Sequence, residues 1–154
     1  MNLIVQKLDP QLIAISKEIY SVFQASYAVE AELLKAVDFP PLKRTLEKFV
    51  QSNNDFFGIW KNDRLAAVAE ISCTESQTHI QSLVVHPIYF RKGLATKIMD
   101  FILVQFGENT VMVETGLDNL PAIRLYEKYG FKEVSRFDTH HGIKKVRFEL
   151  STLK

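Results

Sequence analysis

The feature that most limits the fold of this chain is a change of hydrophobic period near the middle of its sequence. The run Leu65–Cys73 is almost continuously apolar, and a polar turn at 62–63 separates it from the aromatic and apolar run Asp55–Trp60, so the two runs predict a β-hairpin. His79–Val85 predicts a third strand. After Gly93, apolar residues recur at helical spacing. Strands that lead directly into a helix are therefore required.

Both flanks extend this pattern. Leu3–Leu8 predicts a short first strand, after which Asp9 can cap a helix with Pro10 in its first turn, and the pair Pro40-Pro41 ends the helical region. Later elements are predicted as strands at 111–113, 131–137 and 145–150 and as a helix at 119–129. The order predicts an α/β fold with a mixed, mostly antiparallel central sheet flanked by helices, and a single domain over residues 1–154.

Composition narrows the class of partner. The chain has 154 residues, of which 47% are hydrophobic and 24% charged, as in a globular domain. A net charge of +1 gives no field that attracts nucleic acid, and the basic cluster at 144–147 is expected at a solvated strand edge. The N-terminal apolar stretch is too short for a signal peptide or a membrane span. Cys73, expected to be a small buried hydrophobe, suits a reducing compartment, so we expect a cytoplasmic protein.

The segment Leu83–Thr96 predicts a strand that runs into a helix N-terminus. Backbone N–H groups there have no partner within the helix, and the helix dipole adds positive charge, so the turn can bind a diphosphate. Gly93 permits a close approach of the backbone, while Arg91 and Lys92 add mobile positive charge. Many such turns bind nothing, so the loop alone leaves both alternatives open. Its spacing is neither that of a P-loop nor that of a dinucleotide fingerprint, which disfavours an ATPase or a dehydrogenase.

Two stretches together resemble the GNAT superfamily of acetyl-CoA-dependent N-acetyltransferases. The first resembles the acetyl-CoA motif Q/R-x-x-G-x-G/A, with Gly93 and Ala95 at its small positions and Phe90 where the family has a polar residue. The second resembles the pattern N-x-x-A-x-x-x-Y-x-x-x-G-F, which is matched at Asn119, Ala122, Tyr126, Gly130 and Phe131. A chance match to both stretches is much rarer than a match to one.

The resemblance implies the GNAT fold and an enzyme that moves an acetyl group from acetyl-CoA to a primary amine by direct attack in a ternary complex. The acceptor is expected to be a small-molecule amine or a peptide N-terminus, bound partly by the loop at 138–144, and a homodimer is expected. No histidine or cysteine spacing resembles a metal site, so no metal is expected. Coenzyme contacts are implied for Leu83, Val84, Val85, Arg91, Lys92, Gly93, Leu94, Ala95, Thr96, Asn119, Ala122 and Tyr126. The alternative, favoured by Phe90, is a domain of this fold that binds acyl-CoA without catalysis, as a sensor or partner-binding module.

Three residues are candidates for catalysis. The resemblance implies that the phenol of Tyr126 protonates the departing thiolate, although its spacing also fits a core stripe. The amine must lose a proton, because an alkylamine with a pKa near ~10.4 is protonated at neutral pH. Glu114 is the first candidate for this base, at a spacing from Tyr126 similar to that of GNAT enzymes that acetylate protein N-termini, and a strand-end glutamate facing water is its alternative. Glu70, the only charge inside Leu65–Cys73, competes for the role, directly or through water.

Overall fold

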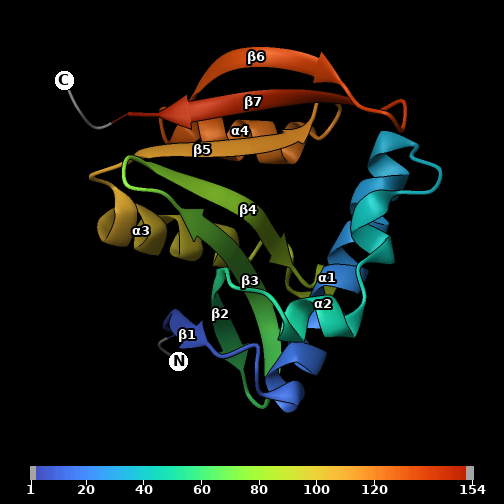
Figure 1. The fold of residues 1–154 in the computed structure, drawn as a ribbon, viewed down its shortest axis with the longest axis vertical. Coiled ribbons are helices and arrows are strands. Elements are labelled where there is room, and N and C mark those ends of the chain that lie inside the picture. The colour runs from blue at the N-terminus through green and yellow to red at the C-terminus, as the bar shows by residue number, and fades with distance from the viewer. Residues whose placement is uncertain (1–2, 152–154) are drawn as a thin grey trace.

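The computed structural model describes residues 3–151, which form a seven-stranded sheet with helices on both faces (Figure 1). The elements are β1 (Gln6–Leu8), α1 (Ile13–Leu34), η1 (Pro40–Lys43), α2 (Leu46–Val50), β2 (Asp55–Lys61), β3 (Arg64–Cys73), β4 (Gln77–Val85), η2 (Pro87–Tyr89), α3 (Leu94–Phe106), β5 (Thr110–Gly116), α4 (Leu120–Lys128), β6 (Lys132–Asp138) and β7 (Lys144–Leu150). The strand order is β1-β2-β3-β4-β5-β7-β6, and all neighbours are antiparallel except β4 and β5. The predicted mixed, mostly antiparallel sheet is confirmed.

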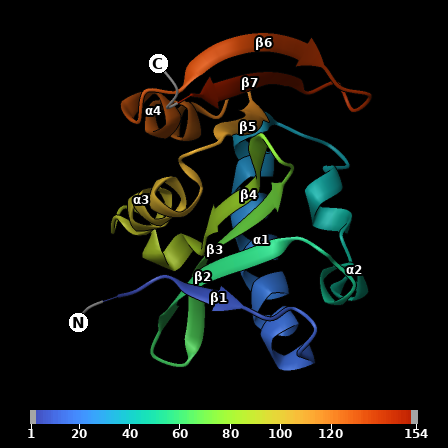
Figure 2. The ribbon, with the colours of Figure 1, turned by 60° about the vertical axis from the view of Figure 1, so that its left-hand side comes forward.

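The helices are divided between the two faces of the sheet (Figure 2). On one face, α3 and α4 cover a core in which Ile98 packs with Val111. On the other face, α1 and α2 contribute Phe23 and Phe49, which are buried with Val68 of β3. A central strand such as β3 therefore has buried side chains on both of its faces, which explains its almost continuous apolar sequence.

The parallel strands β4 and β5 diverge soon after they pair. They pair over Gln77–Ile80 and Thr110–Val113 and, within the described residues, nowhere else. The register between β3 and β4 skips Gln81, which forms a bulge at the point of divergence. Because a bulge bends and twists its strand, β4 turns away from β5, and the carboxyl ends of the two strands leave a gap in the sheet (Figure 1).

The bounds of the first helix differ from the prediction. The Asp9 carboxylate accepts a hydrogen bond from the backbone N–H of Gln11 at 3.0 Å and closes a turn, so it does not cap the helix. Helix α1 begins at Ile13, without a side-chain cap, and ends at Leu34, because the following residue, Lys35, has a left-handed φ of 53°. The left-handed residue Lys35 therefore ends the helix, and the prediction that Pro40-Pro41 ends it is wrong.

Three further expectations are corrected. Strand β5 continues to Gly116 because its last residues pair with β7, so Glu114 lies inside the strand rather than after it. The basic cluster at 144–147 is on β7, which lies between β5 and β6 and is not an edge strand. Cys73 ends β3 and is exposed rather than buried. Among the described residues, none of the helices combines the length and the hydropathy that a bilayer crossing requires.

Candidate active site

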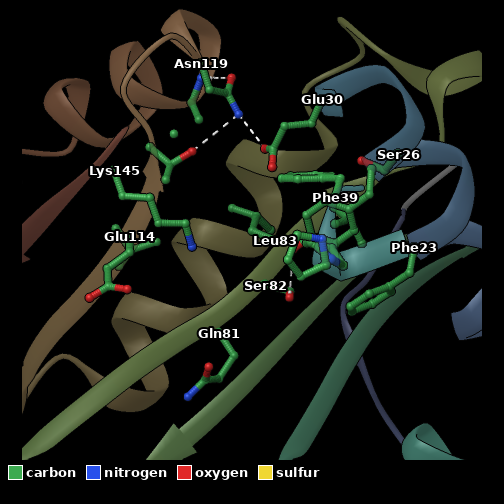
Figure 3. A pocket seen from close by; sticks show the side chains of 18 of the residues that line it. Phe23, Ser26, Glu30, Phe39, Gln81, Ser82, Leu83, Glu114, Asn119 and Lys145 are labelled. Carbon is green, nitrogen blue, oxygen red and sulfur yellow. Dashed lines mark hydrogen bonds between the residues drawn. The ribbon is translucent and has the colours of Figure 1, made fainter. Parts of the chain in front are cut away.

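Two adjoining cavities occupy the region where β4 and β5 diverge. The first, called here the large cavity, has a volume of about 600 Å³ and lies between α1, the two strands and the β6–β7 hairpin (Figure 3). The second, called the loop cavity, has a volume of about 470 Å³ and lies against the loop between β4 and α3. Both cavities are lined by Ser26, Glu30, Leu83, Asn119, Ala122 and Tyr126.

The loop cavity is bordered by backbone that can hold an anion. Arg91 and Gly93 both have left-handed φ angles, 63° and 77°, which turn successive N–H groups in one direction. The first internal bond of α3 runs from the N–H of Lys97 to the carbonyl of Gly93, so the amides from Arg91 to Thr96 have no acceptor among residues 3–151. A Cβ placed on Gly93 would meet no atom within 4 Å, so the space before the loop is open. A diphosphate fits this arrangement.

Most of the predicted coenzyme residues lie together at the loop cavity. Val84 does not, because side chains alternate along β4 and this one is buried on the α1 face. Lys92 lines neither cavity. Phe90, at the motif's polar position, also borders the loop cavity. The predicted residues that line it are Leu83, Val85, Arg91, Gly93, Leu94, Ala95, Thr96, Asn119, Ala122 and Tyr126.

Tyr126 on α4 lines both cavities. Its side chain is buried, with 5% exposed, and its ring packs against Phe131 and Phe148. The hydroxyl has no hydrogen-bond partner in the described part of the chain. Burial is the main cause that raises the pKa of Tyr126, and electrostatic interactions with Tyr27 and Glu30 raise it further. The phenol is therefore protonated at neutral pH and can donate to a group held in either cavity.

Glu70 lies in the wall of the large cavity, where its charge is balanced. Both carboxylate oxygens accept bonds from the Arg44 guanidinium, at 2.6 and 3.0 Å, and Asn54 donates a third at 2.9 Å. Arg44 in turn lies over the ring of Phe49 at 4.0 Å. Glu70 lines the cavity, as its alternation predicted, but both of its carboxylate oxygens are already occupied by hydrogen bonds from Arg44 and Asn54.

Glu114 lies half-buried in the large cavity and is less constrained than Glu70. It projects from β5 beside Lys145, and it forms no ion pair with any residue of 3–151 (Figure 3). The negative charge of Glu114 also acts on His79. Burial lowers the pKa of His79 by more than the attraction to Glu114 raises it. In the described part of the chain, neither a hydrogen bond nor an ion pair therefore holds the Glu114 carboxylate in place.

Glu30 on α1 is a functional candidate that the sequence reasoning missed. Its Oε1 accepts a hydrogen bond of 2.6 Å from the side-chain amide of Asn119, whose own oxygen caps α4 by accepting from the Ala122 N–H (Figure 3). Burial raises the pKa of Glu30, against the opposing effects of the Asn119 bond and the Lys145 charge. This carboxylate is thus a stronger base than an exposed glutamate.

A periodic signal could have found this part of the site. Phe23, Tyr27 and Glu30 are spaced by four and three residues, so the carboxylate falls on the apolar stripe of α1. Tyr27 shares the same face, and its hydroxyl lies 2.9 Å from the hydroxyl of Ser82 on β4. A charge on an otherwise apolar stripe is unusual and indicates a partner or a function.

The remaining wall of the large cavity comes from the β6–β7 hairpin, including His141 and Lys145, where the acceptor loop was expected. Among the residues that line the large cavity, Arg44 is paired with Glu70, so Lys145 is left as the lysine or arginine opposite the two carboxylates Glu30 and Glu114; Arg147, the cross-strand neighbour of Glu114, is paired with Glu149 and does not line the cavity. The cavity therefore suits a cationic amine. Among the described residues, metal-binding side chains do not gather in groups of three.

Comparisons of the sequence with known proteins identify its family. The model of the acetyltransferase (GNAT) family matches residues 17–131. The UPF0157 protein YqkA of Bacillus subtilis is 29% identical over 131 residues, which are 84% of this chain but only 38% of that relative. The ribosomal protein bS18 alanine N-acetyltransferase of Escherichia coli K12 is 26% identical over 114 residues, covering 72% of this chain and 75% of that protein.

Solved structures show the same fold. The crystal structure of the Escherichia coli ribosomal protein S18 alanine N-acetyltransferase superposes with a TM-score of 0.75 at 21% identity, covering 99% of this chain and 97% of that one. The PaiA N-acetyltransferase of Thermoplasma acidophilum, solved in complex with coenzyme A, gives a TM-score of 0.72 at 17% identity, with 97% and 100% covered.

Proposed function

This chain belongs to the acetyltransferase (GNAT) family, and on that premise we propose that it transfers an acetyl group from acetyl-CoA to a primary amine by direct attack in a ternary complex. The observation that carries the proposal is the meeting of two cavities at Tyr126: one bordered by free backbone amides, the other by carboxylates. A ternary reaction needs such a junction, because both reactants must be held in contact at the same time.

The loop cavity is the proposed site of acetyl-CoA. The amides from Arg91 to Thr96 would hold its diphosphate, while Leu83 and Val85 line the path from that loop toward Tyr126. When bound, the coenzyme supplies an acetyl group activated as a thioester. That a coenzyme A complex exists for the PaiA relative supports this assignment.

Tyr126 is the proposed general acid. Its phenol stays protonated because its pKa is raised, its hydroxyl has no described protein partner, and it reaches the junction where the sulfur would lie. It would give its proton to the departing sulfur, a contribution worth roughly 10²-fold or more in rate.

The proposed base on the sheet side is Glu114, acting through water. Glu70 is less suited to that role, because both of its oxygens are engaged by Arg44 and Asn54 and are not free to bind an amine or a water. Its proposed role is instead to hold Arg44 in the cavity wall. If Glu70→Gln rather than Glu114→Gln removed the rise of rate with pH, these two roles would be reversed.

A peptide N-terminus is the proposed first class of acceptor, with small-molecule amines as the second. The relative from Escherichia coli is named for acetylation of an alanine of a ribosomal protein, and the acidic large cavity suits the positive charge of either class. Because this chain spans 38% of YqkA, nothing beyond the acetyl transfer is carried over from that longer relative.

The deciding experiment measures free thiol released from acetyl-CoA over a panel of amines that includes peptides with N-terminal alanine. Turnover with at least one amine supports the proposal. Calorimetric binding of coenzyme A without any turnover would favour the non-catalytic acyl-CoA sensor, and absence of binding would overturn both.

A further inference from the structure

The two cavities share a small set of side chains, and these surround the place where donor and acceptor must meet. Of the carboxylates in the described residues, Glu30 is the only one that lines both cavities. Glu114 and Glu70 line the large cavity alone. Glu30 therefore differs from Glu114 and Glu70, the two carboxylates suggested by the sequence, because it lies where the two cavities meet.

The contacts of Glu30 leave it able to accept a proton. Asn119 donates to its Oε1, and within the described chain Oε2 has no hydrogen-bond partner. The titratable groups that face it are Tyr27 on its own helix, Tyr126 on α4 and Lys145 on β7. Both phenols are neutral at physiological pH, so only Lys145 offsets the negative charge. Figure 3 shows the Glu30 carboxylate directed toward Asn119, above Glu114 and on the opposite side of the cavity from it.

We propose that Glu30 is a further catalytic residue: it binds the acceptor's ammonium group at the junction of the two cavities and takes the first proton from its nitrogen. This inference rests on the proposed acetyl transfer. It assigns the direct base to α1, and it leaves Glu114 to relay the proton onward to water.

The protons of the reaction can be assigned to Glu30, Tyr126 and solvent. Forming the C–N bond and breaking the C–S bond removes two protons from the ammonium nitrogen and adds one to sulfur. Glu30 takes the first proton before attack, and Tyr126 gives a proton to sulfur. The second proton from nitrogen restores Tyr126. One proton is then left for solvent, passed on from Glu30, so each turnover releases one amide, one thiol and one proton.

The test compares Glu30→Gln with Glu32→Gln, an exposed glutamate two residues further along the same helix that lines neither cavity. Glutamine can still accept the Asn119 hydrogen bond, so the link between α1 and α4 is retained while the base is lost. We expect kcat/KM of Glu30→Gln to fall about 10²-fold near neutral pH. Coenzyme A affinity, measured by calorimetry, should stay within about threefold, and Glu32→Gln should behave as the unaltered protein in both assays.

The pH profile separates a base from a structural residue. The acceptor amine deprotonates by itself as pH rises past its own pKa, near ~10.4 for an alkylamine and about 7.7–8.0 for a peptide N-terminus, so the defect of Glu30→Gln should shrink toward alkaline pH. A defect that is the same at every pH, or an unchanged rate, would overturn the inference while leaving acetyl transfer intact. If the unaltered protein releases no thiol with any amine, the proposed function itself fails, and this inference falls with it.

Discussion

At the scale of single residues, Tyr126 combines a buried ring with a hydroxyl that no described residue bonds. Tyr126→Phe should lower kcat by roughly 10²-fold, because it removes only the acid. Coenzyme A affinity should be nearly unchanged, and the free energy of unfolding should change by less than about 0.5 kcal/mol, since no partner loses a bond. Rate assays, calorimetry and urea unfolding measure the three quantities. An unchanged kcat would remove the acid role.

Glu30 should make the stability of the protein depend on pH. Its pKa is higher in the folded than in the unfolded chain, so the folded state binds more protons and stability falls as pH rises from 4.5 through the raised value. Glu30→Gln removes this loss and should therefore be more stable than the unaltered protein at pH 8, with a smaller advantage at pH 4. Urea unfolding at both pH values, with Glu32→Gln as control, provides the check. An equal difference at the two values would contradict the shift.

The motif residues of the site could be predicted from sequence, whereas its cross-chain contacts could not. Gly93 and Tyr126 belong to short local patterns, and the structure places both at the same gap. The partnership of Glu30 with Asn119 joins positions 89 residues apart, and that of Arg44 with Glu70 joins positions 26 apart. The spacing of α1 can mark Glu30 as a charge on an apolar stripe, but no local pattern shows that Asn119 bonds it or that Arg44 pairs with the candidate base Glu70.

At the scale of elements, the turn into α3 depends on Gly93. Gly93→Ala and Gly142→Ala are a matched pair, because both positions have left-handed φ, 77° and 76°, and an added Cβ meets no atom within 4 Å at either. Each should cost about 1–2 kcal/mol of unfolding free energy. Only Gly93→Ala should weaken coenzyme A binding, by roughly tenfold, since its methyl group enters the space assigned to the diphosphate. Equal affinities in calorimetry would place the coenzyme elsewhere.

The salt bridge between Arg44, in the segment that joins η1 to α2, and Glu70 of β3 links this segment to the sheet. Arg44→Met should cost about 3 kcal/mol or more, because Glu70 would keep a buried charge without its main partner. Adding Glu70→Leu should recover most of that loss, since a buried pair is often replaceable by apolar side chains. Urea unfolding of both single variants and the double variant closes the cycle. A double variant less stable than Arg44→Met would show that the pair adds net stability.

Element types were largely predictable, while boundaries and strand order were not. The β2–β3 hairpin and α3 follow from periodicity, because their apolar positions repeat within a few residues. The start of α1 depends on the Asp9 turn, and the place of β7 depends on pairing with both β5 and β6. Such long-range pairing is not encoded in the period of a single strand.

At the scale of the whole molecule, the strands β1–β4 and the strands β5–β7 are joined only where β4 pairs with β5, over Gln77–Ile80 and Thr110–Val113 in the described residues. Coenzyme A bound in the gap should stabilise the folded chain by about 2.7 kcal/mol at a concentration of 100 Kd. For a chain of this length the melting temperature should rise by about 5–10 °C. Differential scanning fluorimetry measures this rise, which should be smaller for Gly93→Ala at the same concentration. No rise for the unaltered protein would contradict a coenzyme site.

The bulge at Gln81 also determines what kind of molecule can lie between the diverging strands. Beyond it, β4 and β5 each have one main-chain edge that pairs with no strand across the gap among residues 3–151. An extended ligand that contains amide groups can form hydrogen bonds with the backbone N–H and C=O groups of these edges. A plain alkyl thioester of equal length would cover the same groups without giving them hydrogen-bond partners. If coenzyme A binds in this gap as proposed, its amide groups would be recognised by the main chain, and a side-chain substitution on β4 or β5 would leave that part of the recognition in place.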